Sequence, residues 1–319
     1  MSSSDRSAVN GSGSRRQRLR RRLGELPVFP TLLTAGNLAC GIVAIFCAAS
    51  TDLLLVHGAV LIFVAMFCDM LDGKVARMTH TEGEFGAELD SLADVVSFGV
   101  APAMLVHRIV LGDNPSRVWG DGEGWMTFVV IFYAVLTAIR LARYNVEHSK
   151  AEATTTFKGL PSPGAAAFLC SWVLFYGMSL DGRWPASYFI LEPATDESAA
   201  VLSQTWHQLF AWFLMGATVV MGVLMVSGFR FPHFANTLLG SKLSYRRWIL
   251  LLLLLGLCIM QPLYGLILGT TAYVLIGAVP GAFDSLRRLR QGKSLLDEDD
   301  DDDDVEEPAE DAARPDAPA

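Results

Sequence analysis

Four aspartates lie in two pairs between the second and third apolar stretches of the sequence. Asp69 and Asp72 are three residues apart. Asp90 and Asp94 are four apart. On helices the members of each pair share one face, and the short connection between the pairs predicts that all four carboxylates converge near the membrane surface. Like charges this close cannot all stay ionised without a cation between them, although each acid alone would also fit a helix end exposed to water.

The residue types around the aspartates indicate chemistry at phosphorus. Carboxylate oxygens without His or Cys favour Mg²⁺ or Mn²⁺ over zinc. Two such ions side by side suit a displacement at phosphorus, because they stabilise the entering and leaving oxygens. Gly73 and Gly86 leave room for a bulky ligand to approach the backbone. Arg77 has the side chain to form two hydrogen bonds with a phosphate.

The elements that must position these acids are apolar helices. Hydrophobic residues make up 52% of the 319 residues and charged residues 18%, and the mean hydropathy is +0.37. These values argue against a disordered chain and against an ordinary cytosolic enzyme. Because roughly 20 apolar residues of helix cross a bilayer, we predict eight spans, with six spans and a broken hairpin as the alternative. The predicted spans lie near residues 31–49, 53–71, 92–111, 125–145, 164–180, 206–228, 247–261 and 263–280.

The basic residues indicate the orientation of the spans. If the N-terminus is cytoplasmic and the spans alternate, three of the 25 Lys and Arg residues (Arg108, Arg117 and Arg183) fall on the outer side and 22 on the cytoplasmic side. Cytoplasmic loops of membrane proteins carry such an excess. Both termini and the aspartates are therefore predicted to face the cytoplasm.

The chain divides into four predicted regions. They are a basic interfacial arm (1–29), a catalytic membrane core of six spans (30–230), two additional spans with a basic flank (231–293), and an acidic, disordered tail (294–319). The first apolar stretch is not a signal peptide, because it lacks a small-residue cleavage site and further spans follow. Five cysteines without a CxxC pair favour packing roles over disulfides or a zinc site.

The segment from Asp69 to Asp94 reads Asp-x2-Asp-Gly-x2-Ala-Arg-x8-Gly-x3-Asp-x3-Asp. It resembles the signature of the CDP-alcohol phosphatidyltransferase family, with every position filled. The resemblance implies an all-α polytopic membrane helix bundle, with a six-helix core plus two C-terminal transmembrane helices here. It also implies a homodimeric enzyme that displaces CMP from a CDP-linked lipid with an alcohol.

The resemblance also implies roles for single residues of this segment. Asp69, Asp72 and Asp90 would bind a pair of metal ions. Asp94 would assist the metal and act as the general base. The residues implied to line the nucleotide and its diphosphate are Gly73, Ala76, Arg77 and Gly86.

Three further stretches resemble the phosphatidylserine synthases within this family. They are residues 30–41, residues 90–102, and residues 140–145 together with 157–163. The resemblance implies that the alcohol is L-serine and the lipid donor CDP-diacylglycerol.

Serine is zwitterionic, so its site needs a cation for the carboxylate and acceptors for the ammonium group. Arg140 and Arg143, three residues apart, are candidates for the cation, with snorkelling to lipid headgroups as the alternative. Asn145 and Ser97 are weaker candidates, because caps and packing are common roles for such residues. Asn37, inside an apolar stretch, is predicted to hydrogen-bond across helices rather than to touch substrate.

Other functions fit parts of the pattern. Glycerol 3-phosphate or inositol phosphate are alternative acceptors, although both call for more basic residues around the acceptor pocket. A transporter or channel also places acids in membrane helices, usually near the bilayer midplane. An inactive scaffold would not need an intact signature. We therefore expect an enzyme of a bacterial inner membrane that uses Mg²⁺ or Mn²⁺ and binds no nucleic acid.

Overall fold

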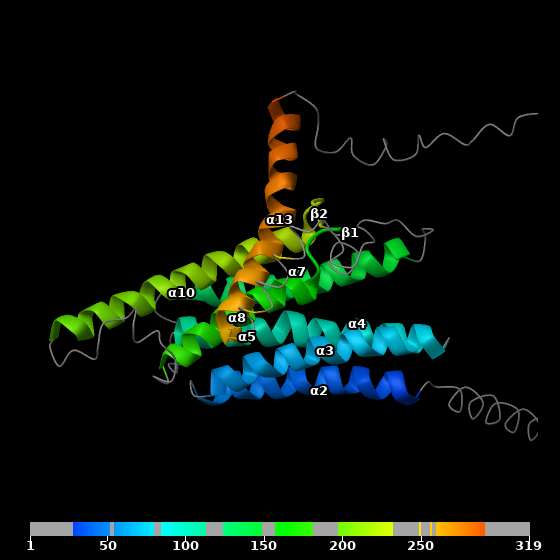
Figure 1. Cartoon of the computed structure of the whole chain (residues 1–319), viewed down its shortest axis with the longest axis horizontal. Coiled ribbons are helices and arrows are strands. Elements are labelled where there is room, and N and C mark those ends of the chain that lie inside the picture. The colour runs from blue at the N-terminus through cyan, green and yellow to red at the C-terminus, as the bar shows by residue number, and fades with distance from the viewer. Residues whose placement is uncertain are drawn as a thin grey trace, which may run out of the picture.

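The protein is a bundle of α-helices with one short β-ribbon (Figure 1). The structure is a computed structural model that describes residues 28–51, 54–79, 84–112, 124–148, 157–180, 197–231 and 260–290, together with residues 249 and 256. In chain order its elements are α2 (Val28–Ser50), α3 (Leu55–Thr79), α4 (Glu84–Asp94), the π-helix η2 (Val95–Val100), α5 (Ala101–Leu111), α7 (Gly124–His148), β1 (Phe157–Lys158), α8 (Ser162–Leu180), α10 (Glu197–Val226), β2 (Arg230–Phe231) and α13 (Pro262–Arg290). The predicted all-α class is confirmed.

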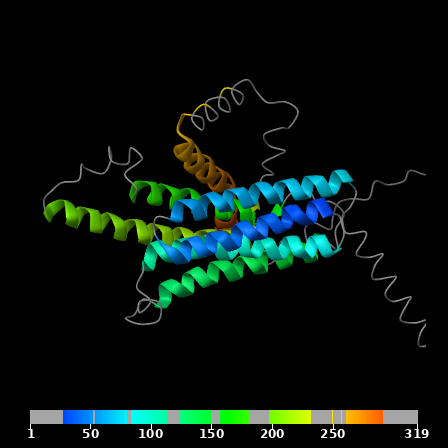
Figure 2. The ribbon, with the colours of Figure 1, turned by 90° about the horizontal axis from the view of Figure 1, so that it is seen from below.

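Six of the described helices are long and apolar enough to cross a membrane. They are α2, α3, the continuous helix formed by α4, η2 and α5, and the helices α7, α10 and α13. The apolar part of α8, Ser162–Met178, is shorter. Figure 2 shows α2, α3, α4–η2–α5 and α7 side by side, whereas α13 runs across their direction (Figure 1). The chain is therefore a multi-pass membrane protein.

Seven of the eight predicted spans correspond to described helices. The predicted span 247–261 lies outside the described residues, except for residues 249, 256, 260 and 261. The basic arm before residue 28 and the acidic tail also lie outside them.

Two predicted span ends differ from the helices. The predicted third span begins at residue 92, but α4 begins at Glu84, because Asp90 and Asp94 lower the hydropathy without interrupting the helix. Similarly, α3 continues past the predicted end at residue 71 to Thr79.

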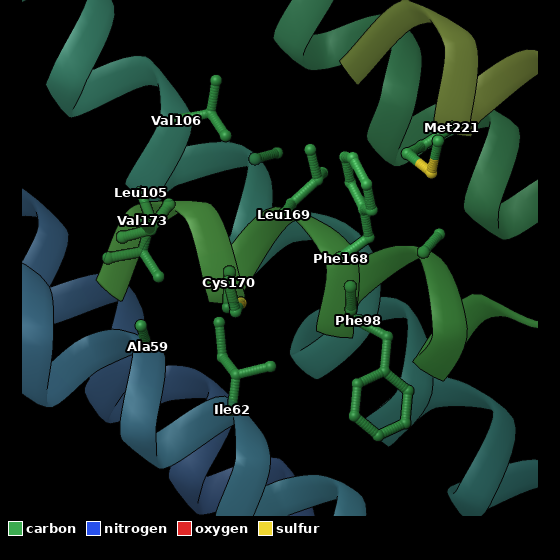
Figure 3. Close-up of a cluster of buried hydrophobic side chains, with 14 of the residues drawn as sticks. Ala59, Ile62, Phe98, Leu105, Val106, Phe168, Leu169, Cys170, Val173 and Met221 are labelled. Carbon is green, nitrogen blue, oxygen red and sulfur yellow. The ribbon is translucent and has the colours of Figure 1, made fainter. Parts of the chain in front are cut away.

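Helix α8 lies at the centre of the bundle. Its residues Leu169, Cys170 and Val173 are fully buried. In Figure 3, Val173 lies beside Leu105 of α5, and Cys170 lies next to Ile62 of α3. Helix α8 packs against α3, α5, α10 and α13, which cover an apolar helix that could not face water. The position of α8 thus depends on helices from both halves of the chain.

The described cysteines are free thiols, namely Cys40, Cys47, Cys68 and Cys170. The fifth cysteine, Cys258, lies outside the described residues.

A π-helical segment follows Asp94 directly. Within η2, the carbonyl of Phe98 accepts a hydrogen bond of 3.0 Å from the Tyr133 hydroxyl of α7. On the α2 side, Ser97 packs so closely on Gly41 that any side chain at Gly41 would collide with it. π-Helical segments are rare and occur frequently at functional sites. This segment fixes the helix that carries Asp94 against both α2 and α7.

The β-ribbon joins the segment before α8 to the end of α10. Phe157 of β1 pairs with Phe231 of β2 in antiparallel register. Gly159 follows β1 with a φ of 91°, a left-handed conformation that favours glycine. Its N–H donates to the Phe229 carbonyl over 2.8 Å. The ribbon thereby holds the start of α8 next to the end of α10.

Helix α13 packs on this ribbon and on α8. Phe231 is buried against Gly277, where a Cβ would collide with the phenyl ring. The hydroxyls of Ser171 and Thr270 lie 3.2 Å apart between α8 and α13. Tyr273 lies over Gly164 in the first turn of α8. These contacts connect α13 to the β-ribbon and to the N-terminal half of α8.

Candidate active site

Three carboxylates meet between the C-terminal half of α3 and the C-terminal half of α4. Asp69 and Asp72 lie in the C-terminal part of α3, and Asp90 lies in α4. Each offers one oxygen, and the three oxygens lie within 4.8 Å of one another. Asp72 is buried, and the other two are half-buried. The structure thus brings together three of the four predicted aspartates, which we call the three-acid cluster.

The three-acid cluster fits a hard divalent cation. Its donors are carboxylate oxygens, which Mg²⁺ and Mn²⁺ prefer. Oδ1 of Asp90 is buried and has no hydrogen-bond partner among the described residues. A buried carboxylate oxygen is costly without a donor or a cation. Asp69, Asp72 and Asp90 are therefore able to hold such an ion.

Asp94 occupies a separate position at the end of α4. It is buried, and its Oδ1 accepts a hydrogen bond of 3.2 Å from Nδ2 of Asn37 in α2. It does not belong to the cluster of described carboxylates within 4.8 Å of one another. The cross-helix hydrogen bond predicted for Asn37 is confirmed.

Asp72 also has a partner on α2. Oγ1 of Thr34 lies 2.8 Å from Oδ2 of Asp72 and 3.1 Å from the Pro30 carbonyl oxygen. The hydroxyl has one proton and donates to one of them at a time. No role for Thr34 was predicted from the sequence. The available signal was its spacing of three from Asn37, which places both polar side chains on one face of an apolar helix.

Arg140 of α7 lies beside the acids. A guanidinium N–H donates to Oγ of Ser162, at the start of α8, over 2.6 Å. The guanidinium also interacts electrostatically with Asp94 and Asp69. Its carbon lies 5.9 Å from the centre of the Tyr144 ring, within cation–π range. Arg140 thus contributes a positive charge to the site, and Ser162 is a second contact that the sequence analysis missed.

The sequence signature of CDP-alcohol phosphatidyltransferases matches residues 27–224, which include the three-acid cluster, Asp94 and Arg140. The chain belongs to the CDP-alcohol phosphatidyltransferase family. Divalent metals are used in this family, which agrees with the carboxylates of the three-acid cluster.

Three relatives of this phosphatidyltransferase carry the name CDP-diacylglycerol–serine O-phosphatidyltransferase. The protein of Helicobacter pylori strain J99 is 34% identical over 261 residues, which cover 82% of this chain and 94% of the relative. The protein of Bacillus subtilis is 33% identical over 220 residues, covering 69% of this chain and 97% of the relative. The protein of Methanocaldococcus jannaschii is 28% identical over 240 residues, covering 74% and 90%.

The signature glycines of the phosphatidyltransferase face open space. A Cβ added at Gly73 or Gly86 would meet no described atom within 4 Å. Ala76 is half-buried, and the side chain of Arg77 lies outside the described residues. Open space beside the acids is what the predicted nucleotide-lining role of these residues requires.

The remaining candidates for acceptor binding lie at different places. Arg143 and Asn145 are exposed near the end of α7, and Nδ2 of Asn145 donates to Oγ of Ser91 over 2.9 Å. Ser97 is fully buried, and its hydroxyl donates to the Asn37 carbonyl over 3.0 Å. Of the four candidates, Arg140 therefore has the closest relation to the acids, whereas Ser97 has the packing role that the sequence analysis left open.

Proposed function

We propose that this protein is a phosphatidylserine synthase, which transfers the phosphatidyl group from CDP-diacylglycerol to the hydroxyl of L-serine and releases CMP. The observation that carries the proposal is the convergence of three signature carboxylates beside Asp94 and Arg140. It occurs in a chain 34% identical to a protein named for this reaction. Membership of the family argues against the transporter alternative.

The lipid donor would bind at the end of the bundle that holds the three-acid cluster. Its acyl chains would stay in the bilayer and its diphosphate would lie next to Asp69, Asp72 and Asp90. These residues would hold Mg²⁺ or Mn²⁺, which we propose as two ions, and the bound metal would offset the negative charge of the diphosphate. The residues proposed to line the nucleotide and diphosphate are Gly73, Ala76, Arg77 and Gly86.

Asp94 would act as the general base. Its carboxylate would take the proton of the serine hydroxyl, and the serine oxygen would attack the phosphorus on the lipid side of the diphosphate. A new oxygen–phosphorus bond forms as the bond from this phosphorus to the CMP oxygen breaks, and CMP leaves. Asp94 lies outside the three-acid cluster but interacts electrostatically with Asp69, Asp90 and Arg140, which supports this role.

Arg140 would bind the serine carboxylate. Because its guanidinium interacts with Asp94, an acceptor held by Arg140 would have its hydroxyl within reach of the base. Arg143 and Asn145 would assist from the exposed end of α7. Ser97 is the weakest candidate, because its buried hydroxyl already donates to the Asn37 carbonyl.

We also propose a location and an assembly. The excess of Lys and Arg on one side of the predicted spans favours an orientation with both termini and the active site in the cytoplasm. The bacterial relatives favour an inner membrane as the location. A homodimer is proposed from the family resemblance.

The acceptor is tested with the purified protein, CDP-diacylglycerol, Mg²⁺ and a panel of labelled alcohols. Serine, glycerol 3-phosphate and inositol phosphate are supplied separately, and CMP release is followed with Asp94→Asn as the inactive control. CMP release that depends on serine, with label in the lipid, is the expected result. Release only with another alcohol would replace serine as the acceptor, and no release with any alcohol would overturn the proposed function.

A further inference from the structure

Helix α2 forms two hydrogen bonds with the candidate active site, although none of its residues belongs to the aspartate signature. Nδ2 of Asn37 lies 3.2 Å from Oδ1 of Asp94, and Oγ1 of Thr34 lies 2.8 Å from Oδ2 of Asp72. Asn37 is fully buried, and Thr34 is 5% exposed. Buried polar groups are costly unless they are hydrogen-bonded, and the partners of these two donors are acids of the active site.

The two acids that α2 contacts occupy different positions. Asp72 belongs to the three-acid cluster, whereas Asp94 does not. A donor bonded to one oxygen fixes the orientation of a carboxylate and directs its other oxygen, as partners of metal ligands commonly do. The same helix face therefore orients one acid within the cluster and one acid beside it.

Asn37 is itself held in place. Its carbonyl accepts a hydrogen bond of 3.0 Å from Ser97, and Gly41, one turn further along α2, lies in close contact with Ser97. The side-chain oxygen Oδ1 of Asn37 is buried and has no hydrogen-bond partner among the described residues. With Asp94 ionised, as its proposed role as a base requires, exchanging the amide oxygen and nitrogen of Asn37 would set two acceptors against each other, so the nitrogen faces the carboxylate.

We propose that Asn37 and Thr34 are positioning residues with different tasks. Asn37 orients Asp94 as a base outside the three-acid cluster, and Thr34 orients Asp72 as a ligand within it. This inference rests on the proposed function, in which Asp94 is the base and the cluster holds the metal.

The two tasks are separated by measuring metal binding and turnover on the same full-length protein. Mn²⁺ binding to purified protein in nanodiscs is followed by electron paramagnetic resonance. CMP release is followed at saturating Mn²⁺, CDP-diacylglycerol and serine. Asn37→Leu should lower kcat about 100-fold, as misplacement of a reacting group does, and leave the Kd for Mn²⁺ unchanged. Thr34→Val should raise the Kd for Mn²⁺ about 10-fold, with kcat restored at saturating Mn²⁺.

Two further variants distinguish positioning from a general loss of packing. Thr218→Val removes a buried hydroxyl of α10, which donates to the Leu214 carbonyl over 2.7 Å, and should change neither kcat nor the Kd for Mn²⁺. Thr34→Ser keeps the hydroxyl and should restore the Kd. Thermal unfolding is recorded for each variant, and Asn37→Ala replaces Asn37→Leu if the latter does not fold.

Three outcomes are separable. Equal shifts of the Mn²⁺ Kd in the variants of Asn37 and Thr34, or an unchanged kcat in the Asn37 variant, would overturn the inference. If the wild-type protein binds Mn²⁺ but releases no CMP with serine, the proposed function is overturned instead. In that case the contrast in Mn²⁺ binding still decides the inference: a raised Kd only for Thr34→Val supports it, and any other pattern contradicts it.

Discussion

Arg140 and Ser162 join α7 to the start of α8 through a hydrogen bond of 2.6 Å, and the same guanidinium interacts electrostatically with Asp94 and Asp69. The Arg140 guanidinium therefore contacts α8, the helix at the centre of the bundle, and also interacts with two of the acids. An anionic acceptor that binds this guanidinium would lie close to the proposed base, which links the binding of the acceptor to its activation.

Replacing Arg140 with Gln should weaken the binding of serine. The KM for serine should rise about 10-fold or more, because hydrogen bonds to charged groups contribute about 1.5–3 kcal/mol, while the KM for CDP-diacylglycerol changes little. Initial rates of CMP release at varied serine concentration measure the effect. Arg287→Gln, at an exposed position of α13, is the matched control. An unchanged KM for serine in Arg140→Gln would remove Arg140 from the acceptor site.

Asp94→Asn should nearly abolish serine transfer while binding of the CDP-lipid survives. Loss of a general base costs about 100-fold or more in rate, and the amide keeps the size of the side chain. CMP release gives the rate, and retention of labelled CDP-diacylglycerol by the purified variant gives the binding. Full activity of this variant would show that another group takes the proton.

Removal of divalent metal should silence the enzyme. The three-acid cluster includes a buried oxygen of Asp90 without a hydrogen-bond partner among the described residues, and its carboxylates require a cation to bind a diphosphate. Treatment with EDTA followed by titration with Mg²⁺ or Mn²⁺ should abolish and then restore CMP release. Activity that is indifferent to chelation would contradict the metal assignment.

Gly73→Ala should leave the fold intact and impair binding of the lipid donor. The added methyl group meets no described atom within 4 Å, and alanine stabilises a helix interior by about 1 kcal/mol relative to glycine. A rise in the KM for CDP-diacylglycerol without a fall in the unfolding temperature would show that a ligand occupies this space. Gly216→Ala in α10, which also meets no described atom, should leave the KM unchanged. Equal effects of the two variants would contradict the nucleotide-lining role of Gly73.

Gly277→Leu should detach α13 from the β-ribbon, because its side chain would collide with the buried ring of Phe231. The unfolding temperature should fall, since overpacking typically costs about 1–3 kcal/mol. Gly269→Leu, on the same helix, is the control, because a Cβ there meets no described atom within 4 Å. Similar unfolding temperatures for both variants would show that the contact with Phe231 contributes little.

The sequence predicts most of the helices and the place where three acids meet. Apolar length determines which segments are helices in a bilayer, and the short connection from Asp72 to Asp90 leaves their helix ends little freedom to separate. The start of α4 was less predictable, because a hydropathy window treats Asp90 as a boundary although the acid lies inside the helix.

The contacts of α2 with the acids could not be predicted in the same way. Whether Thr34 faces Asp72 depends on the rotation of α2 about its axis, which packing of the whole bundle decides. The hydrogen bond between Arg140 and Ser162 likewise joins residues 22 positions apart across a segment with no regular pattern. The π-helix η2 has no periodic signature, since its apolar residues fit a regular helix equally well.

The π-helix η2 also determines how far α5, which follows it, is rotated about the helix axis relative to α4, which precedes it. A π-helical bulge accommodates one more residue than a regular α-helix would over the same length, and each residue turns an α-helix by about 100°. Deleting a single residue from Val95–Val100 would therefore not merely shorten the segment. It would turn Leu105 and the rest of α5 away from α8, or it would turn Asp90 of α4 away from Asp69. The number of residues in η2 therefore sets the angle between the face of α4 that carries Asp90 and the face of α5 that packs on α8.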